Sequence, residues 1–313
     1  MGQIPLNPVY QHFFNQLLIF DQIEEIFFLN WGIAMDMKPS SFGITSTFAS
    51  CGGYGLLLMT GLSQAGGIAP AGQNFTAAAL FLGFGLITSG LIIAVAGQMR
   101  RLMIPEALGL AGAALAGLAL GWSLDPSSGA PAKMPFIASI LLAFISFAAS
   151  FMIGQAESFG ERRMKQLIVP AYLMFTAASG SVLYVVMAEI TKTPSPFYNV
   201  FALCALSSVA LLKLAIWIES DKRRPWSNDA ALKMRGAVEL SLITAMIAVF
   251  AAISSTGSWA MILTLVSCVC TGIALAVDRW MTQRGAIMAL AHTPGAAAQA
   301  PAQTMPAAEQ SAL

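Results

Sequence analysis

The sequence predicts an all-α integral membrane protein, an eight-helix transmembrane bundle with both termini in the cytoplasm. Of its 313 residues, 57% are hydrophobic and only 10% are charged, and the mean hydropathy is +0.72. A soluble domain carries about 25% charged residues, so this chain cannot cover a water-facing surface. The charges also lie mostly in short stretches between long apolar runs. These observations exclude an ordinary soluble enzyme, a secreted disulfide scaffold and a disordered chain.

Each predicted helix is a segment long enough to cross the bilayer. About 20 mostly apolar residues cross the roughly 30 Å of hydrocarbon. Eight segments qualify, and they cover residues 41–62, 74–97, 105–124, 134–154, 167–188, 196–218, 236–255 and 259–280. The loops between them hold nearly every charge, as expected if a charge at the bilayer centre costs about 2.5 kcal/mol or more.

Small residues within these segments predict close helix packing. Lipid supplies no hydrophobic drive for helix association, so helices that approach closely use Gly, Ala and Ser at their contacts. The candidate contact residues are Gly83 with Gly85, Gly109 with Ala113 and Gly117, and Ala178 with Gly180 and Ala205.

The distribution of basic residues predicts the orientation. Thirteen Lys and Arg lie on the side of both termini, and two, Lys133 and Lys192, lie on the opposite side. The thirteen are Lys38, Arg100, Arg101, Arg162, Arg163, Lys165, Lys222, Arg223, Arg224, Lys233, Arg235, Arg279 and Arg284. Because cytoplasmic loops carry an excess of Lys and Arg, both termini are expected in the cytoplasm.

The eight segments form one membrane domain, residues 38–292, with a region at each end. Residues 1–37 are an N-terminal extension, in which an apolar stretch over 13–31 is interrupted by Asp21, Glu24 and Glu25 and so reads as an interfacial helix. An alternative is that translation begins at Met35 or Met37. Residues 293–313 are rich in Ala, Pro and Gln and are expected to be a disordered tail. No cleavable signal peptide is visible.

The sequence offers few groups for catalysis or metal binding. The two histidines, His12 and His292, lie outside the eight segments, so no histidine pair can ligate a haem within the membrane. The four cysteines lie in apolar runs and are expected to be small buried hydrophobes; Cys268 and Cys270 point to different faces of a helix. We therefore expect no catalytic residue and no bound metal, and the net charge of +1 makes nucleic acid an unfavourable partner.

Two sets of polar residues lie near the predicted cytoplasmic edge. The first is Lys213, Glu239, Asp278 and Arg279, for which snorkelling and structural ion pairs such as Lys213 with Asp278 stand against a role in proton or quinol chemistry. The second set, Gln98, Arg100, Arg101 and Glu106, is expected in the loop between the second and third segments. Its members are either loop anchors or a docking or headgroup site.

Several strings, taken in order, resemble the membrane-anchor subunits of the dimethyl sulfoxide reductase family. They are KPSSFGITSTFASCGGYGLL at 38–57, LIVPAYL at 167–173 followed by ASG at 178–180, KLAIW at 213–217 and VDRW at 277–280. The resemblance covers about residues 38–290. It rests on the order and spacing of these strings together with the eight predicted helices.

The resemblance implies a haem-free anchor in the bacterial inner (plasma) membrane that serves anaerobic electron transport. Such an anchor exchanges electrons with the quinone pool, with menaquinol or ubiquinol as its exchangeable substrate. Its partners are an iron–sulfur electron-transfer subunit and a molybdopterin catalytic subunit. The set Gln98, Arg100, Arg101 and Glu106 would then bind quinol or dock a partner.

The chain also departs from the family pattern. The family follows its second span with His-Leu-Gly and Pro-x-Arg-Ala strings, whereas residues 96–107 here read AGQMRRLMIPEA, without histidine. Imidazole suits proton uptake near pH 7, and Gln98 cannot take up a proton. Asp278 also replaces the family's glutamate. Two alternatives therefore stay open: a non-redox assembly or structural protein of the same fold, and a small-solute transporter, although no repeat between the two sets of four segments is visible.

Overall fold

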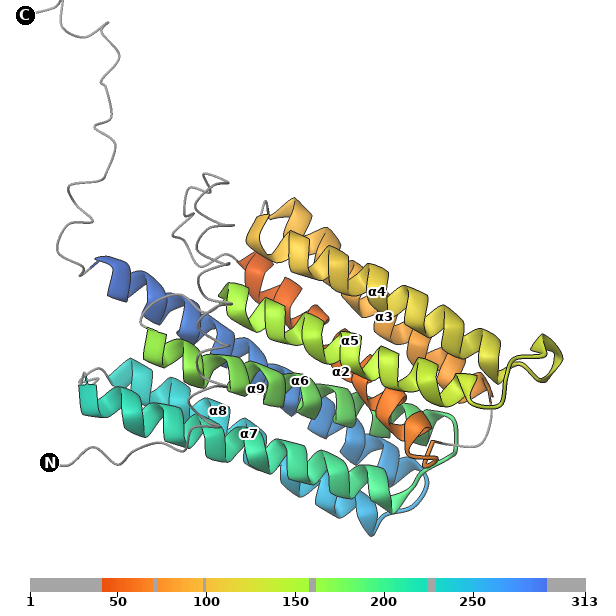
Figure 1. Cartoon of the computed structure of the whole chain (residues 1–313). Coiled ribbons are helices and arrows are strands. Elements are labelled where there is room, and N and C mark those ends of the chain that lie inside the picture. Colours follow the sequence, from red (N-terminus) through yellow and green to blue (C-terminus); the bar gives the residue numbers. More distant parts are fainter. Residues whose placement is uncertain (1–40, 70–72, 98–99, 158–161, 224–228, 292–313) are drawn as a thin grey trace, which may run out of the picture. The chain divides into compact units, whose positions relative to one another are not determined.

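The computed structural model describes residues 41–69, 73–97, 100–157, 162–223 and 229–291, all within the second of two units, residues 39–313. The predicted extension at 1–37 and tail at 293–313 lie outside the described residues. The described residues form helices joined by short connections, without a strand (Figure 1). The elements are α2 (Ser41–Ala65), α3 (Gln73–Ala96), α4 (Arg100–Leu124), the short 3-10 helix η1 (Pro126–Ser128), α5 (Met134–Glu157), α6 (Arg162–Ile190), α7 (Pro196–Arg223), α8 (Asp229–Ile253) and α9 (Ser258–Ala291).

Seven of the described helices, α3 to α9, are long and apolar enough to cross a membrane. The prediction of a multi-pass membrane protein is therefore supported. The first predicted span corresponds to α2, which has 25 residues and a length of roughly 37 Å at 1.5 Å per residue, but α2 is not among the seven.

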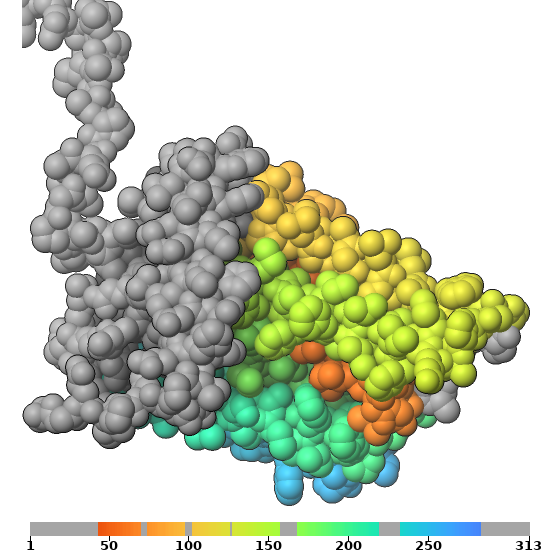
Figure 2. Space-filling view, in the orientation of Figure 1, coloured from red at the N-terminus to blue at the C-terminus, as the bar shows by residue number. Residues whose placement is uncertain are grey.

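The composition of α2 is explained by its neighbours. Its 25 residues include seven Ser or Thr and five Gly, and it contacts α3, α5, α6 and α9. From Ala49 to Ser63, every residue except Leu58 and Leu62 is buried. Figure 2 accordingly shows only a small part of α2 at the surface, between neighbouring helices. A helix covered by protein needs no apolar coat against lipid, so low hydropathy in α2 reflects its central position.

The helices form two halves with the same order of neighbours. In the N-terminal half, α2 to α5, each helix contacts the next and α5 closes the ring on α2. In the C-terminal half, α6 to α9, each helix contacts the next and α9 closes on α6. The halves meet chiefly through α2, which contacts α6 and α9, and through α6, which contacts α5 as well. This repetition of neighbours was not visible as a sequence repeat.

Two glycines allow the central helices α2 and α6 to touch. A Cβ atom added at Gly55 would lie 2.1 Å from the carbonyl oxygen of Thr176, and one added at Gly180 would lie 2.0 Å from the carbonyl carbon of Gly55. No side chain fits at either position, so the two backbones are in direct contact. This is the close approach that small residues permit between membrane helices.

Of the other glycines predicted at helix contacts, three pack against a neighbouring helix and one does not. A Cβ at Gly83 would meet Leu57, one at Gly109 would meet Tyr54 and Ala149, and one at Gly117 would meet Phe84. Those three contacts are confirmed. The prediction for Gly85 is wrong, because nothing lies within 4 Å of a Cβ there.

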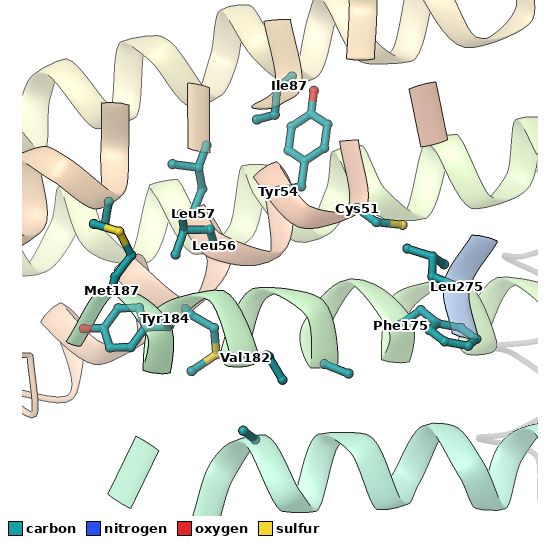
Figure 3. Packing of buried hydrophobic residues seen from close by; sticks show 14 of the residues in the cluster. Cys51, Tyr54, Leu56, Leu57, Ile87, Phe175, Val182, Tyr184, Met187 and Leu275 are labelled. Carbon is teal, nitrogen blue, oxygen red and sulfur yellow. The ribbon is translucent and has the colours of Figure 1, made fainter. Parts of the chain in front are cut away.

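Large apolar side chains from both halves fill the core around α2 and α6. In Figure 3, Tyr54 lies beside Ile87 in the N-terminal half, and Phe175 lies beside Leu275 in the C-terminal half. All four cysteines are free, but only Cys51 is buried; Cys204 is exposed on α7. The expectation of buried cysteines is therefore wrong for Cys204, which occupies an outward face that an apolar thiol can present to lipid.

Candidate functional site

Buried charged side chains lie toward the same end of the helices in both halves. Because consecutive helices alternate in direction, the N-terminal ends of α2, α4, α6 and α8 lie together with the C-terminal ends of the other four helices. Glu106 lies six residues after α4 begins, and Lys213 lies ten residues before α7 ends. We call this region the charged end. Its side chains form two clusters, one in each half.

The first cluster, the Glu106 cluster, joins α4 to α2. Glu106 has no solvent-exposed surface, and its Oε1 atom accepts hydrogen bonds from Ser50 Oγ at 2.7 Å and from Ser46 Oγ at 3.2 Å. The Tyr54 hydroxyl donates to the backbone carbonyl of Glu106 at 3.0 Å. Ser46, Ser50 and Tyr54 are themselves fully buried. The carboxylate and its helix are thus both held by α2.

Glycines on neighbouring helices make room for these hydroxyls. A Cβ at Gly90 of α3 would lie 2.5 Å from Ser50 Oγ, and one at Gly109 of α4 would lie 2.4 Å from the Tyr54 hydroxyl. Any larger residue at either position would displace the hydroxyl. The Glu106 cluster is therefore closely packed by α2, α3 and α4.

The structure corrects the expected position of the second predicted set. Glu106 does not lie in a loop: α4 begins at Arg100, so Arg100, Arg101 and Glu106 are all helical. Pro105 is accommodated because it lies in the second turn, where its missing N–H leaves only the carbonyl of Arg101 without a helical donor. Gln98 and the side chains of Arg100 and Arg101 lie outside the described residues. Because Glu106 is fully buried, it cannot dock a soluble partner directly.

The second cluster, the Lys213 cluster, joins α7 to α9. Lys213 Nζ lies 2.7 Å from Asp278 Oδ1, and both side chains are almost completely buried. The ammonium also lies 5.5 Å from the centre of the Phe175 ring on α6. The ion pair expected between Lys213 and Asp278 is therefore present, and it is internal to the C-terminal half.

Arg279 and Glu239 have different surroundings from this pair. The Arg279 guanidinium is buried and lies 4.5 Å from the centre of the Tyr172 ring. That ring in turn covers Gly154 of α5, where a Cβ would lie 3.2 Å from it. Glu239 is half-buried on α8, and its Oε1 atom has no hydrogen-bond partner in the described chain.

Thr176 of α6 and Cys51 of α2 form a polar contact between the two clusters. The Thr176 hydroxyl on α6 donates to the carbonyl of Tyr172 at 3.0 Å and lies 3.5 Å from Cys51 Sγ on α2. Cys51 follows Ser50 of the first cluster, and Tyr172 contacts Arg279 of the second. The clusters are thus neighbours across the contact between α2 and α6.

Sequence reasoning missed Ser46, Ser50 and Tyr54. Their spacing, i, i+4 and i+8, does place them on one helix face, so a polar stripe was detectable. The partner of that stripe was not, because Glu106 lies 56 residues from Ser50. A hydroxyl stripe alone predicts only that some helix covers it.

The two clusters differ in the chemistry they support. A serine hydroxyl can donate to a carboxylate and can also accept from a protonated carboxyl group, so the Glu106 cluster suits proton exchange. A lysine ammonium only donates, so the Lys213 cluster suits a structural ion pair with Asp278. Within the described residues, no group of three or more His, Cys, Asp or Glu could hold a metal ion.

Comparison with known proteins gives no family for this chain. No family model matches it, and no curated protein matches it.

Proposed function

We propose that the chain is the haem-free membrane anchor of an oxidoreductase complex and exchanges electrons with the quinone pool. Its partners would be an iron–sulfur electron-transfer subunit and a molybdopterin catalytic subunit, as the resemblance to dimethyl sulfoxide reductase anchors implies. Menaquinol or ubiquinol would be the exchangeable substrate. The proposed location is the bacterial inner membrane, with α2 as the eighth span and both termini in the cytoplasm.

The observation that carries the proposal is the buried carboxylate of Glu106 under two serine hydroxyls. Oxidation of a quinol releases two electrons and two protons, and a haem-free anchor needs a side chain to accept protons near the headgroup. The family-like histidine is absent from residues 96–107, but this region does supply a carboxylate. Glu106 is therefore the proposed proton acceptor, and Arg100 and Arg101 lie one to two turns before it on α4.

The first test is affinity purification of the tagged full chain from its native membranes in mild detergent, with mass spectrometry and metal analysis. The proposal expects iron–sulfur and molybdenum subunits to co-purify. Recovery of the chain alone, free of iron and molybdenum, would favour the non-redox or transporter alternatives.

The second test measures how fast a quinol analogue reduces the iron–sulfur clusters of the purified complex, followed by electron paramagnetic resonance. Glu106→Gln is expected to lower the rate at least tenfold, on the scale of general acid–base catalysis. The double variant Arg100→Ala/Arg101→Ala is expected to lower this rate or the retention of partner subunits. Lys233→Met, which removes an exposed cation on α8, is the matched control.

A further inference from the structure

The proposed function leaves open how Glu106 is held in position for proton transfer. Resting on that function, we propose that Ser50 is the positioning residue for Glu106, and that Ser46 supports it. In the step concerned, a quinol O–H bond breaks, a carboxyl O–H bond forms on Glu106, and the electron pair stays on the quinol oxygen. The resulting quinolate then loses its second proton to water and passes two electrons to the iron–sulfur subunit. Ser50 takes no part in bond making; it fixes the acceptor.

The geometry favours Ser50 over Ser46. Both hydroxyls donate to the same oxygen, Glu106 Oε1, but the bond from Ser50 is 2.7 Å and the bond from Ser46 is 3.2 Å. Hydrogen bonds to a charged acceptor are short and about twice as strong as neutral ones. Of the two serine bonds, the 2.7 Å bond from Ser50 therefore contributes more to holding the carboxylate.

Ser50 is also confined by the neighbouring helix α3. Gly90 of α3 faces its hydroxyl so closely that a Cβ there would lie 2.5 Å from Ser50 Oγ. The Tyr54 hydroxyl, one turn further along α2, binds the backbone carbonyl of Glu106 and so fixes α4 against α2. Side chain and backbone of Glu106 are thus both fixed to the same helix face. A pre-positioned acceptor lowers the cost of orientation in the transition state.

The kinetic test uses Ser50→Ala, Ser50→Thr and Ser46→Ala, with Ser89→Ala as the control. Ser89 is exposed on α3, and its hydroxyl bonds only within its own helix. In the purified complex, Ser50→Ala should lower the maximal rate of quinol oxidation about tenfold without changing the half-saturating quinol concentration. Ser50→Thr, which keeps the hydroxyl but adds a methyl group to a closely packed site, should lower the rate less than Ser50→Ala does; Ser46→Ala should also have a smaller effect than Ser50→Ala, and Ser89→Ala none.

Two kinetic outcomes would overturn the proposal. One is a wild-type rate for Ser50→Ala. The other is a raised half-saturating concentration at an unchanged maximal rate, because Ser50 would then bind quinol and not position Glu106. Size-exclusion profiles of each variant complex separate these outcomes from misfolding.

A second readout does not depend on quinol oxidation. Infrared difference spectra of the full chain in nanodiscs assign the Glu106 carboxyl band as the band lost in Glu106→Gln. Ser50→Ala should shift that band, whereas Ser89→Ala should not. An unshifted band overturns the positioning role. If the band shifts while Glu106→Gln oxidises quinol at the wild-type rate, the proposed function fails and the positioning role falls with it, although the hydrogen bond itself is established.

Discussion

The two halves of the molecule bury a carboxylate in the same end but hold it by opposite means. In the N-terminal half, Glu106 accepts hydrogen bonds from the hydroxyls of Ser46 and Ser50. In the C-terminal half, Asp278 pairs with the ammonium of Lys213. The halves share an order of helix contacts, so the difference lies in a few side chains and not in the fold.

This difference separates the two carboxylates by the chemistry that their partners support. The buried Lys213 ammonium needs the Asp278 carboxylate as its partner, because an uncompensated charge in a low dielectric is costly. Protonating Glu106 leaves its serine partners able to accept where they had donated. The comparison predicts a structural role for the Lys213 cluster and a chemical role for the Glu106 cluster.

The largest expected effect is on stability, from breaking the ion pair. Lys213→Met leaves the buried Asp278 carboxylate without its lysine, which should lower the free energy of unfolding by about 3–5 kcal/mol. Asp278→Leu in the same chain should recover most of that loss, because replacing a whole buried pair with apolar residues is often neutral. The measurement is equilibrium unfolding in mixed micelles, with Lys233→Met as an exposed control. A double variant no more stable than the single one would contradict the structural role.

A smaller loss of stability is expected from crowding the Glu106 cluster. Gly90→Ala places a Cβ 2.5 Å from Ser50 Oγ, whereas Gly85→Ala on the same helix meets nothing within 4 Å. Overpacking typically costs about 1–3 kcal/mol, so Gly90→Ala should be destabilising. Gly85→Ala should be neutral or slightly stabilising, because Ala favours a helix over Gly. The same unfolding assay compares the two; equal stabilities would show that α3 does not confine Ser50.

A still smaller change in stability is expected from Glu106→Gln, although it should abolish most quinol oxidation. The glutamine side chain has nearly the same shape, and its carbonyl oxygen can accept from Ser46 and Ser50, so unfolding should change by less than about 1.5 kcal/mol. The pairing of near-normal stability with lost activity would set the Glu106 cluster apart from the Lys213 cluster. A loss of stability as large as that of Lys213→Met would instead make Glu106 structural.

The sequence predicted the helices better than their environments. The start of α5 at Met134 and of α7 at Pro196 agree with the predicted segments, because apolar length alone sets a span. Lys213 and Asp278 could be paired because they are opposite charges at similar depth near the same end. The central position of α2 was not predicted, although its hydroxyl and glycine content is the mark of a helix shielded from lipid.

The Glu106 cluster could not be predicted, because its contacts join residues distant in sequence. The predicted third segment began only at residue 105, because two arginines interrupt the apolar run just before it. In the structure α4 simply begins earlier, and Glu106 turns inward to meet Ser50 on another helix. Periodicity gives the buried face of each helix, but which faces pair depends on how closely their surfaces fit, as in the backbone contact of Gly55 with Gly180.

The smallest effect is expected at an exposed carboxylate that serves as a reference for Glu106. Asp125, before η1, accepts hydrogen bonds from the Ser127 backbone N–H at 2.9 Å and from its hydroxyl at 2.8 Å. These bonds, the backbone bond first, lower the pKa of Asp125 below its ordinary value. A lowered pKa in the folded state stabilises the fold above the ordinary carboxyl pKa, and this contribution is lost as the pH falls through the lowered pKa.

Ser127→Ala removes the hydroxyl but keeps the backbone donor, so the pKa of Asp125 should rise only part of the way to its ordinary value. The carbon-13 shift of the labelled Asp125 carboxyl, assigned with Asp125→Asn and followed from pH 6 down to pH 2, measures this. Because Asp125 is solvent-exposed, this isolates the effect of a serine hydroxyl on a carboxylate from that of burial. If Ser127→Ala leaves the titration unchanged, the backbone N–H alone holds Asp125. A serine hydroxyl would then have no effect on an exposed carboxylate, and any effect of Ser50 on Glu106 would depend on the burial of that pair.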